Sequence, residues 1–296
     1  MTLAASDSPA AAPVHWADVL PPARPGVLGV VTRRRVASAW AWREGLAVTV
    51  AAGLHRHGQV QLVLADGQAV AAELAGIDEA TDLAVLRAPA VRAPPLTPSD
   101  RVPRLGDALA VLGRQPSGEA HASFGHVGLV GPAWRTWLGA RVDHRVRLDG
   151  GLFPGLPGGP VLDAAGRVIG LASAALGRHH GTLLPTATVT RVVQALAERG
   201  AVPRARLGVA LQAAAARVEG SVQPGLLVTH VSEGGAADAA GILVGDLVVE
   251  AGGRSTGDLA ALRDALDSLA AGAALPMTVA RGGTRVPLQA GPWGQA

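Results

Sequence analysis

Short apolar runs separated by Gly, Pro and Asp-Gly are the feature that most restricts how this chain can fold. The sequence contains 39 Gly and 21 Pro among 296 residues, and 49% of it is hydrophobic. Two pairs of runs have hairpin spacing: residues 59–65 with 70–74 around Asp66-Gly67, and residues 161–163 with 168–173. This pattern excludes a disordered chain and predicts a mostly β protein.

One long helical pattern follows these strands. Val189, Val192, Val193 and Leu196 fall on one helical face, and Gly200 is expected to end the helix. Strands followed by a late helix favour a double β-barrel or a sandwich that a C-terminal helix closes. We therefore expect a first domain over residues 26–202, preceded by a flexible arm over residues 1–25.

The pattern of expected strands and helices changes after Pro203 and Arg204. This change predicts a linker there and a second domain over residues 205–292. Strands are expected at 208–212, 225–231, 247–251, 276–280 and 285–289. A helix is expected where Leu residues share a face, with Thr256 as its cap; these residues are Leu259, Leu262, Leu266 and Leu269.

Composition excludes several functions. The chain has no Cys, which rules out disulfides, thiolate metal sites and a cysteine nucleophile. All 26 basic residues are Arg and the formal net charge is only +3, so the pI of 10.9 reflects missing buffering groups. The run at residues 33–35 is a solvated segment, and we predict no nucleic-acid partner.

The N-terminal segment predicts neither export nor a membrane anchor. Asp7 stands where a signal peptide carries positive charge, and no apolar run approaches the ~20 residues of a membrane span. The expectation from these features is a cytoplasmic protein with no membrane span.

Three segments of the first domain occur in the order and spacing of a known family. They are residues 45–54 (GLAVTVAAGL), 81–86 (TDLAVL, with Asp78 before it) and 155–161 (GLPGGPV). Over residues 27–202 the chain resembles trypsin-like proteases of the HtrA/Deg type. The second domain resembles a PDZ module, through residues 207–209 (LGV), 239–242 (AAGI) and 245–246 (GD). The resemblance implies a chymotrypsin-like double β-barrel followed by an α+β PDZ domain.

The same resemblance places the catalytic residues of the family on this sequence. The Asp falls on Asp82, the His on Ala52 and the nucleophilic Ser on Pro157. Such an Asp acts only through the imidazole, and proline offers neither a hydroxyl nor the N–H that would form the oxyanion hole with Gly155. The resemblance therefore implies a pseudoprotease in which Asp82 and Gly155 are vestigial.

Two alternatives remain open at the sequence level. One is an active serine endopeptidase that uses non-standard residues, with His55 or His57 as base and Ser123 or Ser173 as nucleophile. The other is a histidine metal site, for which His55 and His57 on one strand face and the pair at 179–180 are candidates. We predict neither a metal ion nor a cofactor.

The PDZ-like domain retains its expected binding residues. The loop of Leu207, Gly208 and Val209 is expected to present backbone N–H groups to a peptide carboxylate, with Leu262 and Leu266 completing the groove. Arg206 could add positive charge or be a solvated linker residue. The expected partners are protein or peptide C-termini, together with an active HtrA-type paralogue that the protein would modulate.

Overall fold

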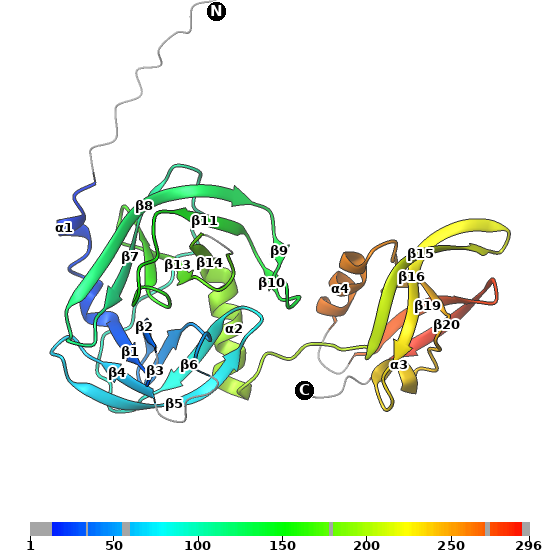
Figure 1. Ribbon diagram of the computed structural model, residues 1–296, viewed down its shortest axis with the longest axis horizontal. Helices are drawn as coiled ribbons and strands as arrows, with labels where there is room; N and C mark the ends of the chain where they lie inside the picture. Colours follow the sequence, from blue (N-terminus) through cyan, green and yellow to red (C-terminus); the bar gives the residue numbers. More distant parts are fainter. Residues whose placement is uncertain (1–13, 34, 55–59, 178–179, 270–272, 292–296) are drawn as a thin grey trace, which may run out of the picture. The chain divides into compact units, whose positions relative to one another are not determined.

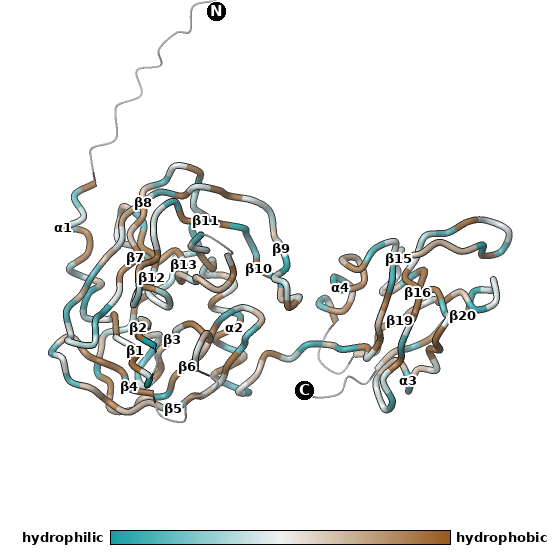
Figure 2. Tube along the Cα trace, in the orientation of Figure 1, coloured by the Kyte–Doolittle hydropathy of each residue, from teal (hydrophilic) through white to brown (hydrophobic). Residues whose placement is uncertain are grey.

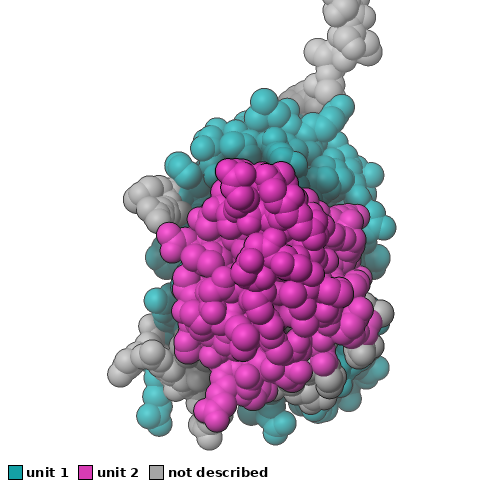
Figure 3. Space-filling model, turned by 90° about the vertical axis from the view of Figure 1, so that its right-hand side faces the viewer, with its two compact units in different colours: residues 1–202 teal, residues 203–296 magenta. Residues whose placement is uncertain are grey.

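The computed structural model describes residues 14–33, 35–54, 60–177, 180–269 and 273–291 (Figure 1). The chain divides into two compact units, residues 1–202 and 203–296 (Figure 3). Among the described residues no helix is long and apolar enough to cross a membrane. Each unit is described separately below.

The first unit contains two closed six-stranded antiparallel barrels. Barrel one has the order β1-β2-β3-β6-β5-β4 and barrel two the order β11-β14-β13-β12-β7-β8. Closure leaves no free sheet edge in either barrel. Barrel one consists of β1 (Val27–Val31), β2 (Val36–Arg43), β3 (Leu46–Thr49), β4 (Val60–Val63), β5 (Ala69–Asp78) and β6 (Leu83–Arg87).

Barrel two is formed by strands from the second half of the unit, and a short hairpin forms a separate sheet outside it. Its strands are β7 (Ala108–Arg114), β8 (Ala120–Gly131), β11 (Arg145–Asp149), β12 (Pro160–Asp163), β13 (Val168–Ser173) and β14 (Thr182–Pro185). The hairpin pairs β9 (Trp134–Arg135) with β10 (Arg141–Val142). The expected hairpins are present as β4–β5 and β12–β13, and Gly67 in the first turn has φ +83°.

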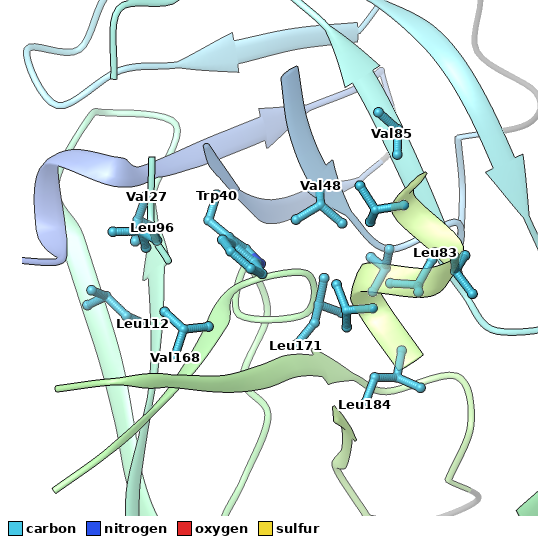
Figure 4. Close-up of a cluster of buried hydrophobic side chains, with 14 of the residues drawn as sticks. Val27, Trp40, Val48, Leu83, Val85, Leu96, Leu112, Val168, Leu171 and Leu184 are labelled. Atoms are coloured by element: carbon cyan, nitrogen blue, oxygen red, sulfur yellow. The ribbon is translucent and has the colours of Figure 1, made fainter. Parts of the chain in front are cut away.

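A single helix, α2 (Thr186–Arg199), packs on strands of both barrels. Its buried face contains Val189, Val192, Val193 and Leu196, as the periodicity predicted, and Gly200 ends it with φ +74°. The main hydrophobic cluster joins this face to residues of both barrels around the fully buried Trp40 (Figure 4). Each barrel also has a hydrophobic cluster of its own, and the shared cluster joins the two barrels into one unit.

Part of the expected N-terminal arm is ordered. Residues 1–13 lie outside the described residues, but Trp16–Val19 form helix α1 and Arg24–Gly26 a 3-10 turn. Ala23 is buried in the main cluster and Trp16 contacts the ring of Phe124 on β8. The described part of the expected arm therefore contacts the first unit through Ala23 and Trp16.

The second unit is a six-stranded antiparallel sheet with two helices. Hydrophobic and hydrophilic residues are mixed along its strands (Figure 2). Its path is β15-β16-β17-β19-β20, with β18 paired to β17. The elements are β15 (Val209–Val218), β16 (Ser221–Val231), α3 (Ala236–Ala239), β17 (Leu247–Ala251), β18 (Arg254–Ser255), α4 (Leu259–Asp267), β19 (Leu275–Arg281) and β20 (Thr284–Ala290).

The cap of α4 differs from the sequence expectation. Asp258 accepts the N–H of Ala261 at 2.8 Å and is the N-cap. Thr256, the predicted cap, is fully buried and donates its hydroxyl to the Val248 carbonyl at 2.9 Å. Asp and Thr are both favourable N-cap residues, so residue type alone does not decide between them. Asp258 is the N-cap because it directly precedes the first helical residue, Leu259.

Candidate functional site

Asp82 lies in the turn between β5 and β6 and is 3% exposed. Its φ of +56° is a conformation that few non-glycine residues adopt. Both carboxylate oxygens are occupied: Oδ1 accepts the backbone N–H of Ala52 at 2.9 Å, and Oδ2 accepts the hydroxyl of Ser173 at 2.6 Å. The Asp82 carbonyl accepts the N–H of Ala51 at 3.1 Å, so the turn is held at several points.

Burial dominates the electrostatics of this carboxyl. It raises the pKa of Asp82 above its ordinary value, while the hydrogen bonds from Ser173, Ala52 and Ala51 and the charge of Arg35 act in the opposite direction. In a Ser-His-Asp triad the Asp holds an imidazole. Here the two side-chain oxygens are bonded to an amide and to a serine hydroxyl instead.

Ala52 and Gly53 follow β3, and Gly53 lies against the side chain of Arg35. A Cβ atom added to Gly53 would lie 2.8 Å from Cδ of Arg35, so the arginine stem lies against this turn. Arg35 is also the cation that acts on Asp82. His55 and His57 lie outside the described residues.

The segment from Gly155 to Gly159 is attached to β2 by hydrogen bonds. The Gly155 carbonyl accepts the Ser38 hydroxyl at 2.6 Å, and the Pro157 carbonyl accepts the Ser38 N–H at 2.8 Å. A Cβ on Gly158 would lie 2.0 Å from the Ser38 carbonyl oxygen, so only glycine fits there. Glycines in this segment therefore allow close backbone approach between the barrels.

Hydrogen bonds also connect the Pro157 segment to the Ala52 segment. Thr49, at the end of β3, donates its hydroxyl to the Ser38 carbonyl at 2.7 Å. Ser38 therefore joins Pro157 on one side to the strand that leads into Ala52 on the other. The segment of Ala52 is therefore bonded directly to Asp82 and is linked to the segment of Pro157 through Ser38 and Thr49.

The alternative nucleophiles are engaged elsewhere. Ser173 is fully buried and donates to Asp82, and the Ser123 hydroxyl donates to the Gly151 carbonyl at 2.8 Å. Sequence reasoning named Ser173 only by residue type and missed its bond to Asp82. It also missed Ser38 and Arg35, because neither stands in one of the three motif segments.

The metal alternative finds no support in the part of the chain that the structure describes. No group of three or more His, Asp or Glu side chains there could hold a metal ion. Two of the candidate histidines, His55 and His57, and one of the later pair, His179, lie outside that part.

In the second unit, the 207–209 loop is tied to the turn before α3. The Gly208 carbonyl accepts the Ser232 N–H at 2.7 Å, and the Leu207 carbonyl accepts the Ala237 N–H at 2.8 Å. Gly208 has φ +75°. Within the described residues neither Leu207 nor Gly208 donates its N–H to a partner. β15, which begins at Val209, is an edge strand with one unpaired side.

The two predicted groove leucines differ in burial. Leu262 is 1% exposed and belongs to the core of the unit together with Leu207. Leu266 is partly buried and packs on that core, as do Val209 and Leu211 of β15. Leu266 is therefore the accessible one of the pair, and Leu262 is a core residue.

Comparison with known proteins agrees with this architecture. Residues 29–171 match the family of trypsin-like peptidase domains, and residues 227–281 match the PDZ domain family. A probable periplasmic serine endoprotease DegP-like of Chlamydia trachomatis is 31% identical over 242 residues, covering 77% of this chain and 48% of that protein. This chain belongs to the HtrA-type proteases. It spans about half the length of the curated relatives it matches.

Solved structures of HtrA-type proteins have the same fold. The serine endoprotease from Yersinia pestis superposes with a TM-score of 0.78 at 23% identity, covering 95% of this chain and 98% of that one. The HtrA-type protease AlgW with tripeptide superposes with a TM-score of 0.72 at 26% identity, covering 93% and 95%.

The relatives correct one expectation from the sequence. Several are named as periplasmic serine endoproteases, which points to a location outside the cytoplasm. The prediction of a cytoplasmic protein is therefore wrong; it rested on N-terminal composition alone, which is weaker evidence than the location of relatives.

Proposed function

We propose that this HtrA-type protein binds peptides through its PDZ domain and does not cleave them. The observation that carries the proposal is Pro157, which stands at the position of the nucleophile. Its ring has no hydroxyl to attack a carbonyl and no N–H to stabilise the resulting oxyanion, so a single residue removes two parts of the mechanism.

The surroundings of Asp82 support the same proposal. Ala52 contributes only a backbone N–H to the carboxylate, and Ser173 takes the other oxygen. An aspartate in a triad contributes by orienting an imidazole and stabilising its charged form. With its two oxygens bonded in this way, Asp82 serves as a support for the turn at Ala51 and Ala52.

The peptide-binding part of the proposal rests on the 207–209 loop and the edge of β15. Free N–H groups at Leu207 and Gly208 suit a terminal carboxylate, and an unpaired strand edge suits an extended chain. HtrA-type neighbours include a protease solved with a decapeptide and with a tripeptide. The partners we propose are protein C-termini with an apolar last residue, including those of an active HtrA-type paralogue.

A serine-reactive fluorophosphonate probe tests the first half of the proposal. The full chain should remain unlabelled, whereas an active HtrA-type protease in the same reaction should be labelled stoichiometrically. Stoichiometric labelling of this chain would support the alternative, an active endopeptidase with non-standard residues. In that case mapping the labelled residue, together with His55→Ala and His57→Ala variants, would identify the substitute machinery.

Titration with peptides tests the second half. The full chain should bind peptides that end in Leu or Val, and an amidated copy of the same peptide should bind at least ~10-fold more weakly because the charge is lost. The segment 205–296, which has its own hydrophobic core, should behave similarly. If binding is confined to that segment, the groove in the full chain is already occupied. If neither binds any free C-terminus, the PDZ half of the proposal fails.

A further inference from the structure

His121 on β8 is a histidine that the site described above does not use. Its ring nitrogens Nδ1 and Nε2 are both shielded from solvent and have no hydrogen-bond partner among the described residues. A buried imidazole without partners is costly, because each unpaired polar group loses about 1–3 kcal/mol. Such a group in a native structure calls for an explanation.

The ring lies directly beneath the 155–159 segment. His121 pairs with Gly113 across β7 and β8, and the missing side chain of Gly113 leaves room for the imidazole. A Cβ on Gly113 would lie 2.8 Å from both His121 Cε1 and Ser38 Oγ. A Cβ on Gly155 would lie 3.3 Å from His121 Cε1 and Nε2. The imidazole is therefore packed between two glycines and next to the serine that binds the Gly155 carbonyl.

Backbone hydrogen bonds also hold this segment in place. Besides the two bonds with Ser38, the Gly158 N–H donates to the Ala172 carbonyl at 2.8 Å, and the Ala172 N–H donates to the Gly159 carbonyl at 3.0 Å. Within the segment and the turn before it, the Gly159 N–H donates to the Leu156 carbonyl at 2.9 Å and the Leu156 N–H to the Phe153 carbonyl at 3.1 Å. Leu156 is fully buried in the core of barrel two. Movement of Gly155 breaks its bond with Ser38, and movement of the whole segment also draws Leu156 out of that core and breaks the bonds with Ala172.

We propose that His121 is a pH-responsive latch for residues 155–159, closed when its imidazole is neutral and open when it is protonated. The neutral ring fits between Gly113 and Gly155. The charged ring carries two N–H donors that have no acceptor there, and it must move toward solvent to be hydrated. Because Gly155 covers the ring, that movement displaces the segment.

Burial lowers the pKa of His121, and it is the cause that acts on this ring in the described part of the chain, where no ion pair to His121 is found. The packed elements carry their charged groups elsewhere: Arg114 beside Gly113 donates its guanidinium to the carbonyls of Arg24, Val27 and Gly118. The other titratable or charged residues on β2, β7 and β8 are Arg43 and His126, and Arg35 and Glu119 stand directly before β2 and β8.

Titration of carboxylates does not produce the same effect in the same pH range. The raised pKa of Asp82 means that its folded form gains stability as the pH falls, which opposes opening. Burial raises the pKa of Asp163 but the hydrogen bonds from Arg167, Ala165 and Arg101 outweigh it, so the pKa is lowered and the carboxylate stays charged to more acidic pH. A pH-dependent opening that disappears in His121→Phe therefore reports on this histidine.

Amide hydrogen exchange on the full chain measures the latch. Protection factors of Leu156, Gly158 and Gly159, corrected for intrinsic exchange rates, should be constant near pH 7.5. Below the pKa of His121 they should fall by up to ~10-fold per pH unit, as one proton linked to opening requires. In His121→Phe, which keeps the ring volume without the nitrogens, the protection should not depend on pH.

Two further variants serve as controls. His126→Gln changes an exposed histidine of the same strand and should keep the wild-type pH profile. Ser38→Ala removes the bond to Gly155 and should lower the protection of the segment at every pH. Should His121→Phe fail to fold, NMR titration of the wild type decides: the amides of the segment must shift with the same midpoint as the His121 ring.

Wild-type protection that does not change between about pH 7.5 and about pH 4.5 would overturn the proposal. So would a His121→Phe variant that keeps the wild-type pH dependence, or segment amides whose midpoint differs from that of His121. The inference does not depend on the proposed function, because none of these measurements involves a peptide or hydrolysis.

Discussion

The backbone N–H of Ala52 donates to Oδ1 of Asp82 across 2.9 Å, between two turns that are 30 residues apart in the sequence. The contact places the carboxylate of Asp82 beside residue 52, which is an alanine in this chain. The register that placed the family's His on Ala52 is thus compatible with the geometry, and it defines the first experiment.

Restoring the triad requires both missing side chains. Ala52→His alone and Pro157→Ser alone should show no hydrolysis of unfolded casein above buffer, because each lacks the partner group and triad members act as a unit. Only the double variant restores imidazole, hydroxyl and the N–H at position 157 together. Clear activity in either single variant would show that the register is wrong. Since Arg35 lies against Gly53, a triple variant with Arg35→Ala should be at least as active as the double one.

Asp82 should matter for stability. Asp82→Ala removes the acceptor for Ala52 and Ser173 and places a residue without a side-chain acceptor at φ +56°, so we expect a loss of about 2–3 kcal/mol in the free energy of unfolding. Asp82→Asn keeps an acceptor and tolerates this backbone conformation, so its loss should be nearer to about 1 kcal/mol. Urea denaturation measures both. Equal losses in the two variants would contradict the role assigned to the turn.

Arg114 should be the most sensitive charged residue at the junction of the barrels. Its side chain is 3% exposed and donates to the carbonyls of Val27, Gly118 and Arg24. Burial lowers the pKa of Arg114, the charge of Arg24 lowers it further, and Asp66 acts the other way. Arg114→Met keeps much of the stem but leaves buried carbonyls unpaired, so unfolding should become easier by about 3 kcal/mol. The exposed Arg104→Met is the matched control, and it should change the denaturation midpoint little.

The PDZ unit should lose stability in acid through Asp246. Burial raises the pKa of this carboxyl, but the hydrogen bonds from Arg281 at 2.8 Å and from Leu243 outweigh it and hold the pKa below its ordinary value. A lowered pKa contributes stability above about pH 4, and that contribution disappears as the pH falls through the folded-state value. Asp246→Asn should therefore be less stable than the wild type at neutral pH and approach it as the pH falls through the folded-state pKa of Asp246. A constant difference across this range would contradict the ion pair's role.

Leu266 is the better position for blocking the peptide groove. Leu266→Arg should abolish peptide binding while the thermal transition of the PDZ unit stays near that of the wild type, because the side chain is only partly buried. Leu262→Arg should unfold the unit, because Leu262 is 1% exposed and an unpaired buried charge is strongly destabilising. Normal peptide binding by a folded Leu266→Arg protein would remove α4 from the proposed groove.

Local signals in the sequence determined most of the architecture. Turn residues such as Asp66-Gly67 and the spacing of Val189, Val192, Val193 and Leu196 act over a few residues, so hairpins and the buried face of α2 could be predicted. The identities Ala52 and Pro157 are likewise properties of the sequence, and the absence of their functional groups needs no coordinates. Composition at the N-terminus was misleading for location, because it describes one segment rather than the family.

Only the tertiary structure decided which distant groups meet. Ser38 and Gly155 are 117 residues apart, and Ser173 and Asp82 are 91 apart, yet each pair forms a buried hydrogen bond at 2.6 Å. The position of His121 beneath Gly155 depends on the absence of a side chain at Gly113 on the neighbouring strand. Such contacts follow from barrel closure and strand register, and no local pattern encodes which residues closure will bring together.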